Sequence, residues 1–312
     1  MKKRTINLLK VGLSLGLLAL IFREIGWRKI LGALQGAQLS HLAMAFAIYL
    51  AGILLRAYRW RILLAALGMN APLSRLTELY LVGTFFNNFL PTGIGGDVVR
   101  VYELSKDSDR PAESIGTVLL DRATGFLALF LMAAAALVFA HRLIAPSVAA
   151  AILLLFLASW AGSWALLQRD RLESWGLLKL IAKLKPVHEI YEAVYACGLR
   201  AIGGALAVSL AFNLLLIAVN YLIALSLGVQ VSIWYFLVFI PLISLSLIFP
   251  LSLSGLGVRE GGYVYLFAQA GVPAPLALAM SLLFYALNVA TGLIGGVLYA
   301  LEGARGYLED RR

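Results

Sequence analysis

The chain has 312 residues, of which 62% are hydrophobic and only 13% are charged. A soluble domain carries about 25% charged residues, so this composition excludes an ordinary water-soluble globular protein. The formal net charge is +10, and the bases cluster between apolar runs, as the positive-inside rule requires, rather than on a soluble nucleic-acid-binding face. The single cysteine, Cys197, excludes an internal disulfide and a cysteine metal cluster, and the three histidines are isolated, so the sequence predicts no metal and no cofactor.

Eight segments are apolar over most of a membrane-spanning length, which is roughly 20 helical residues. They are too long and alternate too weakly to be strands of an outer-membrane barrel. The sequence therefore predicts an all-α polytopic membrane protein with about eight transmembrane helices, at residues 6–22, 42–55, 76–90, 112–140, 146–167, 201–227, 234–249 and 275–301. A basic start, Met1–Arg4, precedes the first span with no cleavage site after it, which places the N-terminus in the cytoplasm.

The second predicted span ends in three arginines interleaved with aromatic residues, at residues 56–61. One interpretation is a cytoplasmic boundary with an aromatic belt. The other is that Arg56 or Arg59 contacts a phosphate group, because a guanidinium fork matches phosphate oxygens. Arg56 follows the apolar run directly and is expected to lie deepest.

A polar stretch at residues 87–100 interrupts the next apolar run. Proline and adjacent glycines stop a helix, and the broken backbone cannot face lipid. The charged flanks favour a re-entrant hairpin, although one crossing made of two half-helices is the alternative. The residues of this segment that we expect to bind a ligand are Asn87, Asn88, Gly93, Gly95, Asp97 and Arg100.

Three further features lie between this segment and the second half of the chain. Asp121 and Arg122 sit inside the apolar helix at residues 112–140, and either compensate each other or let Arg122 line the same cavity as Arg100. Residues 169–200 have apolar residues at helical spacing among charges, and are expected to form an amphipathic linker in the cytoplasmic interface. Asn213 and Asn220 share a helix face and are expected to form interhelical hydrogen bonds.

A second broken segment, at residues 250–262, repeats the pattern of the first. Each follows an apolar run that ends in proline, contains Gly-x-Gly and is followed by an arginine and an acid. The second set is Gly255, Gly257, Arg259 and Glu260. Paired interrupted segments in two halves indicate a transporter's substrate site, and a broken helix end suits an anion. We therefore divide one membrane domain, residues 1–312, into a first half at about 1–168, the linker and a second half at about 201–312.

These residues resemble the lysylphosphatidylglycerol synthase transmembrane (flippase-like) family of bacteria and archaea. The resemblance rests on residues 56–60, 87–100, 114–126 and 254–260. It implies a helical domain of about eight spans in the cell (inner) membrane of a prokaryote, which moves a lipid across the bilayer. The soluble aminoacyl transferase that some members carry is not expected in a chain that stops at Arg312. The lipid is left open as lysylphosphatidylglycerol, another phospholipid or a polyprenyl-phosphate-linked sugar.

Three functions follow from this interpretation. In the first, a lipid flippase or scramblase holds a headgroup phosphate with Arg100, Arg122 and Arg259, and Asn87 and Asn88 form hydrogen bonds to it. The carboxylates of Asp97, Asp121 and Glu260 either orient the arginines or contact a cationic headgroup. No Walker A motif is present, so ATP is not the direct energy source. The second is a scaffold for a separate glycosyl- or aminoacyl-transferase, and the third, an enzyme acting on lipid phosphates, lacks a nucleophile beside a base. The first predicts that Gly93–Arg100 and Gly255–Glu260 are neighbours in space.

Overall fold

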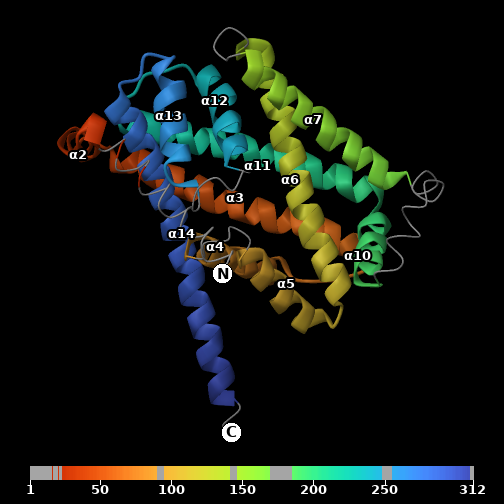
Figure 1. Ribbon diagram of the computed structural model, residues 1–312. Coiled ribbons are helices and arrows are strands. Elements are labelled where there is room, and N and C mark those ends of the chain that lie inside the picture. The colour runs from red at the N-terminus through yellow and green to blue at the C-terminus, as the bar shows by residue number, and fades with distance from the viewer. Residues whose placement is uncertain are drawn as a thin grey trace. The chain divides into compact units, whose positions relative to one another are not determined.

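Figure 1 shows a computed structural model of the chain, in which every regular element of the described part is a helix. The described part comprises Gly16, Leu20 and residues 23–89, 95–140, 146–168, 185–247 and 255–309. Most of the predicted first span, residues 90–94 with Gly93, residues 169–184 of the predicted linker and residues 248–254 lie outside it.

Within the described residues, four helices are long and apolar enough to cross a membrane, namely α3 (Leu39–Ala66), α6 (Pro111–Ala140), α11 (Gly198–Ser226) and α14 (Ala274–Glu309). The helix α7 (Pro146–Leu167) coincides with the span predicted there. The starts of α6, α11 and α14 differ from the predicted starts by no more than a few residues, because apolar length sets the extent of a membrane helix. The chain is a multi-pass helical membrane protein, as its composition predicts.

The helix α3 corrects one predicted boundary. It runs without a break from Leu39 to Ala66, so the expected end of the second span at Leu55 is wrong. Arginine is a good helix former, and the guanidinium groups of Arg56 and Arg59 have partners inside the protein. The helix therefore continues through the arginines instead of ending at them.

The described helices divide into two compact units. The first contains residues 1–53, 81–96 and 213–312, and the second contains residues 54–80 and 97–212. Neither unit is continuous in sequence, because the chain passes from one to the other within α3, α4 (Leu73–Phe89), α5 (Gly95–Ser108) and α11. Each unit is described by itself.

Aromatic packing organises the first unit around α12 (Ile233–Ser246) and α13 (Val258–Ala268). The ring of Phe267 lies 4.9 Å from that of Phe236 and 5.3 Å from that of Phe239, centroid to centroid. Nearer the broken segment, a Cβ added at Gly262 would lie 3.3 Å from the Ile243 side chain. The early part of α12 thus meets the late part of α13, so the two helices are antiparallel.

Pro241 falls in the middle of the span predicted at residues 234–249, yet it does not end the helix there, because it lies inside α12 and is buried. A proline removes one backbone hydrogen bond, and packed neighbours tolerate this in membrane helices.

Glycines of α14 allow close helix packing in the first unit. A Cβ added at Gly295 would lie 2.0 Å from the carbonyl oxygen of Leu81 on α4, and one at Gly296 would lie 2.6 Å from the Phe85 ring. Small residues let helix backbones approach in a membrane, where van der Waals contact replaces the hydrophobic effect. This unit also includes α2 (Trp27–Gln35), which packs against α14.

The helices α4 and α5 form the antiparallel hairpin that the re-entrant alternative requires. At its open end, Arg75 of α4 pairs with Glu103 at 3.5 Å and Asp107 at 3.0 Å on α5. At its tip, the side-chain oxygen of Asn87 accepts a hydrogen bond from the Gly96 backbone N–H at 2.9 Å. The start of α4 thus contacts the end of α5, and the end of α4 contacts the start of α5, so these two helices are antiparallel like α12 and α13.

The second unit packs α6 against α7 and α10 (Lys185–Ala196) (Figure 1). A Cβ added at Gly116 of α6 would lie 3.0 Å from Cβ of Ala193 on α10. Pro111 is the first residue of α6, where its missing N–H costs nothing. The described end of the predicted linker is thus a helix held on α6 by small residues.

Candidate functional site

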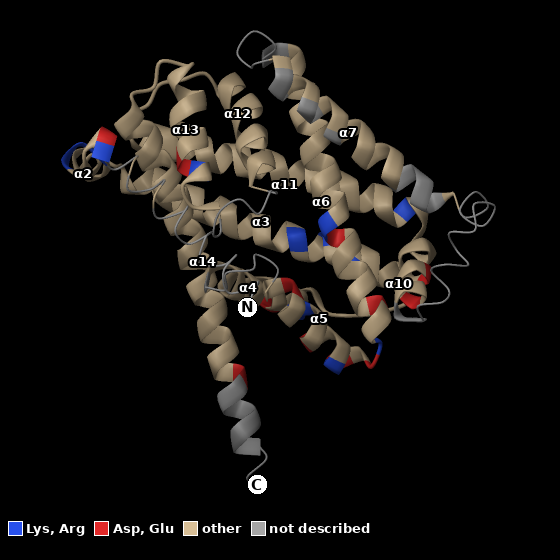
Figure 2. Ribbon diagram, viewed as in Figure 1, with Lys and Arg blue, Asp and Glu red and all other residues tan. Residues whose placement is uncertain are grey.

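Figure 2 shows that few charged residues interrupt the apolar ribbons of α3 and α6. Apart from Arg61 of α3 and Glu113 of α6, they belong to one set of side chains in the second unit, which we call the arginine cluster. Its members are connected by ion pairs or by contact with the Tyr80 ring, and they are Arg56, Arg59, Asp97, Arg100, Asp121 and Arg122. Every member was a candidate site residue from the sequence.

Asp121 of α6 lies at the centre of the cluster, with only 1% of its side chain exposed. It accepts a hydrogen bond from Nε of Arg59 at 2.7 Å and one from Nη2 of Arg100 at 3.1 Å. The hydroxyl of Tyr80 donates a third. A carboxylate that joins three elements in this way fixes α3, α5 and α6 to one another.

Each of the three guanidinium nitrogens of Arg59 donates a hydrogen bond. Besides Asp121, its Nη1 donates to Oγ of Ser209 at 2.9 Å and its Nη2 to the Tyr80 hydroxyl at 3.5 Å. It is buried, whereas Arg56 is half-buried. Arg59 is thus more buried in the protein than Arg56, because it has a carboxylate partner, and the depth of Arg56 in the membrane stays a prediction.

Arg100 of α5 is held between aromatic faces. Its Cζ lies 4.1 Å from the Trp60 ring centroid and 3.8 Å from that of Tyr80, a geometry of cation–π attraction. Its Nη1 lies 3.3 Å from Asp97. Its Nε is buried and has no hydrogen-bond partner in the part of the chain that the structure describes.

The adjacent residues Asp121 and Arg122 do not compensate each other. Arg122 pairs instead with Asp97, which also pairs with Arg100. Neighbouring residues on a helix point in different directions, so the pairing follows from packing rather than from sequence adjacency. The structure thus brings Arg122 and Arg100 onto one carboxylate, and the cavity that the functional alternative gives them stays a prediction.

Arg56 differs from the other arginines because it contacts rings only. Its Cζ lies 4.8 Å from the Tyr80 centroid and 5.4 Å from that of Phe212, and among the described residues no carboxylate lies within ion-pair distance. The cluster as a whole has four guanidinium groups and two carboxylates. It therefore contains an excess of positive charge in a largely apolar unit.

The first unit contains a smaller and balanced ion pair. Arg259 donates to Glu260 from Nη2 at 2.6 Å and from Nε at 3.1 Å, and its Nε lies 3.2 Å from the Ser281 hydroxyl. Its Cζ lies 4.4 Å from the Tyr285 ring centroid. Both ionised side chains are buried, so a single carboxylate offsets a single guanidinium.

The chain's own side chains occupy the N-terminal N–H groups at both broken segments. Glu260 accepts from the Gly257 N–H at 2.6 Å, at the start of α13. Asn87, on the last turns of α4, accepts from Gly96 at the start of α5, while Asn88 donates to the Asn288 carbonyl at 3.2 Å. One N–H at the start of each helix thus already has an acceptor.

The glycines have distinct conformations. Gly255 and Gly257 have φ of 76° and 86°, which only glycine adopts without strain. Gly95 begins α5 with ordinary helical geometry. Gly93 lies outside the described residues. Gly255–Glu260 belongs to the first unit and Asp97–Arg100 to the second, and their proximity stays a prediction.

Sequence reasoning missed four side chains that complete the two sites: Tyr80, Trp60, Ser209 and Ser281. Trp60 and Tyr80 were assigned to a membrane boundary and an apolar run, although both rings contact Arg100. The two serines are polar residues inside apolar helices, which is the only signal they give. The predicted role of Asn220 is confirmed, since Tyr263 of α13 donates to its side-chain oxygen on α11.

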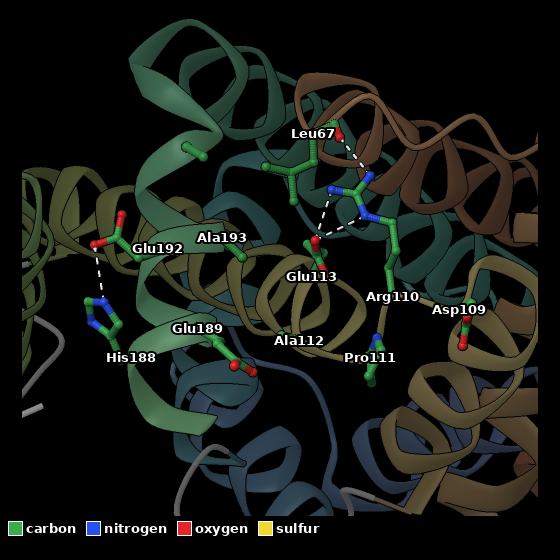
Figure 3. A pocket seen from close by; sticks show the side chains of 11 residues that line it. Leu67, Asp109, Arg110, Pro111, Ala112, Glu113, His188, Glu189, Glu192 and Ala193 are labelled. Atoms are coloured by element: carbon green, nitrogen blue, oxygen red, sulfur yellow. Dashed lines mark hydrogen bonds and ion pairs between the residues drawn. The ribbon is translucent and has the colours of Figure 1, made fainter. Parts of the chain in front are cut away.

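A cavity of about 540 Å³ lies at the start of α6, beside α10 (Figure 3). Figure 3 shows Arg110 turned towards Glu113 and the Leu67 carbonyl, and His188 towards Glu192. Four carboxylates line it against one arginine and one histidine. Its charge has the opposite sign to that of the arginine cluster, so it is not the place for an anion.

The helices and the cluster define a class: a multi-pass helical membrane protein with a buried, cation-rich group of side chains. The model of the family described as "Lysylphosphatidylglycerol synthase TM region" matches residues 7–296. The chain therefore belongs to this family, as the resemblance indicates. A UPF0104 membrane protein of Methanocaldococcus jannaschii is 30% identical over 104 residues, which cover 33% of this chain and 31% of that protein. A UPF0104 membrane protein of Methanothermobacter thermautotrophicus is 26% identical over 287 residues, 84% of this chain and 85% of that protein.

Proposed function

We propose that this protein moves a lipid with a phosphate-containing, anionic headgroup across the membrane in which its helices lie. The observation that carries the proposal is the positive excess of the arginine cluster, together with its position on three helices that contact one another through Asp121. Uncompensated charge is costly in an apolar environment. A bound anion offsets that cost, so the cluster is suited to hold a headgroup during its passage.

The exposed fractions suggest an order of contact. The Arg122 side chain is 33% exposed and that of Arg100 only 3%, while Arg56 is half-buried. A phosphate would meet Arg122 or Arg56 first and reach Arg100 later. Arg59 and Asp121 would hold the geometry, since their polar atoms already have partners.

Arg259 would contribute differently. Its guanidinium is neutralised by Glu260, so it gains from an anion only if the carboxylate moves aside or is protonated. We therefore assign the first contact with the headgroup to the arginine cluster. The membrane concerned would be the cell membrane of a prokaryote, with the N-terminus in the cytoplasm.

The test is lipid movement in proteoliposomes that contain a phospholipid labelled with a fluorophore on its acyl chain. Dithionite added outside destroys the outer-leaflet signal, and further loss reports translocation. The informative variant is Arg56→Gln, because removing this arginine leaves no carboxylate without its partner and should not disturb folding. Arg61→Gln, five residues further along α3 and exposed, is the matched control.

We expect wild type and Arg61→Gln to move the lipid and Arg56→Gln to move it at least about tenfold more slowly, as the loss of one charge contact in a low-dielectric site implies. No movement by the folded wild-type protein with any phosphate-containing lipid would overturn the proposed function. Equal rates for the two variants would remove Arg56 from the site.

A further inference from the structure

The charge balance of the arginine cluster indicates what kind of phosphate it takes. Four guanidinium groups face two carboxylates, which leaves two positive charges. A separate acidic group in the same unit pairs with Arg75. Its carboxylates, on Glu78, Glu103 and Asp107, lie at the open end of the α4–α5 hairpin, each within 3.5 Å of Arg75.

The unused hydrogen-bond donors of the cluster lie around one ring. Arg56 and Arg100 both have their Cζ atoms within 5 Å of the Tyr80 centroid, at 4.8 Å and 3.8 Å. Arg56 contacts only rings among the described residues, and Nε of Arg100 lacks an acceptor although the side chain is 3% exposed. Arg59, by contrast, has its donors occupied. The excess charge and the free donors thus belong to the same two arginines.

We propose that the lipid which binds here is a phosphomonoester, whose headgroup is a dianion, rather than a phosphodiester or an aminoacylated lipid. This inference rests on the proposed function. A phosphomonoester carries about −1.5 to −2 charges near pH 7 and has three acceptor oxygens. It neutralises the cluster and satisfies both arginines.

The other lipid classes match the cluster less well. A phosphodiester headgroup such as that of phosphatidylglycerol brings one negative charge and leaves one arginine uncompensated. A lysyl ester adds two ammonium groups to that single phosphate, so the headgroup becomes a net cation and is repelled. A buried charge that has no partner is strongly destabilising. We therefore expect a large difference in binding between a headgroup that neutralises both arginines and one that neutralises only one.

The first experiment compares three acyl-labelled lipids in the same proteoliposomes: phosphatidic acid, phosphatidylglycerol and lysylphosphatidylglycerol. We expect phosphatidic acid to move about tenfold faster than phosphatidylglycerol, and the lysyl lipid to move slowest. In Arg56→Gln the excess falls to one charge, so the preference for phosphatidic acid should disappear, while Arg61→Gln keeps it.

The second experiment separates binding from movement. The thermal stabilisation of the detergent-solubilised protein is measured with glycerol 1-phosphate, a dianion, and with dimethyl phosphate, a monoanion, at equal ionic strength. We expect half-maximal stabilisation at about tenfold lower concentration of the dianion, and no such difference in Arg56→Gln.

The outcomes distinguish the two proposals. If all three lipids move equally fast, or phosphatidylglycerol or the lysyl lipid moves fastest, the inference is overturned and the proposed function stands. If no lipid moves but the dianion still stabilises wild type selectively, the proposed function fails and the charge-selective site stands. Equal stabilisation by the two soluble phosphates in wild type would overturn the inference on its own.

Discussion

The strongest test of the site's architecture is the replacement of Asp121 by asparagine. The side chain keeps its shape and one oxygen but loses its charge. Its new NH2 group then competes for space with guanidinium donors of Arg59 and Arg100, which now bond the carboxylate at 2.7 Å and 3.1 Å. Both arginines would remain buried, at 5% and 2% exposure, without the anion that compensates them.

The expected cost follows from this geometry. Removing one partner of a buried ion pair destabilises a protein by about 3–5 kcal/mol, because the remaining charge is uncompensated. For a chain of this size each kcal/mol lowers the melting temperature by about 2–4 °C. Asp121→Asn should therefore lower it by roughly 6–20 °C.

The assay is thermal unfolding of the detergent-solubilised protein, followed by intrinsic tryptophan fluorescence, to which Trp60 beside Arg100 contributes. The control is Glu78→Gln, which removes a carboxylate that is 29% exposed and shares Arg75 with two other acids. An exposed pair is worth about 0–1 kcal/mol, so the control should melt within a few degrees of wild type. Similar small shifts for both variants would refute the claim that Asp121 compensates two buried charges.

Three further predictions concern packing and reactivity. Gly295→Ala should destabilise the protein by about 1–3 kcal/mol or more in the same thermal unfolding assay, because its Cβ would lie 2.0 Å from a carbonyl oxygen of α4. The control, Gly162→Ala, has open space around the added methyl group and should be neutral or slightly stabilising. Burial raises the pKa of Cys197 to about 11, so the thiol is protonated at neutral pH. Maleimide should therefore label it only after unfolding, as measured by mass. Rapid labelling of the folded protein at pH 7 would contradict its burial. Tyr263→Phe should cost about 1–3 kcal/mol, because a buried amide on α11 loses its donor, whereas a comparable loss in exposed Tyr265→Phe would show that the effect is not specific.

Local properties of the sequence were sufficient for the membrane architecture. A stretch such as residues 146–167 becomes a helix of the predicted length because its apolar side chains and the thickness of a bilayer set its extent. The hairpin of α4 and α5 was also predictable in outline, since proline and glycine end a helix and the charged flanks lie at one end. These signals act over a few residues and need no knowledge of the neighbours.

The partners of the charged side chains depended on the tertiary structure. Asp121 is separated by 62 positions from Arg59 and by 21 from Arg100, and only the packing of α3, α5 and α6 brings them together. The sequence identified all three as site residues, but it offered Arg122 as the partner of Asp121. Adjacent residues of a helix point about 100° apart, so sequence neighbours seldom pair.

The same reason explains how the broken segments differ from the site first expected. The sequence by itself determined that glycines would open the helices near Asp97 and Glu260, because that is a property of the backbone. Only the folded chain decides that oxygens of Asn87 and Glu260 occupy the N–H groups so exposed. It also decides that the excess positive charge lies in the arginine cluster, because the number of carboxylates that meet each arginine is set by helix packing and not by composition.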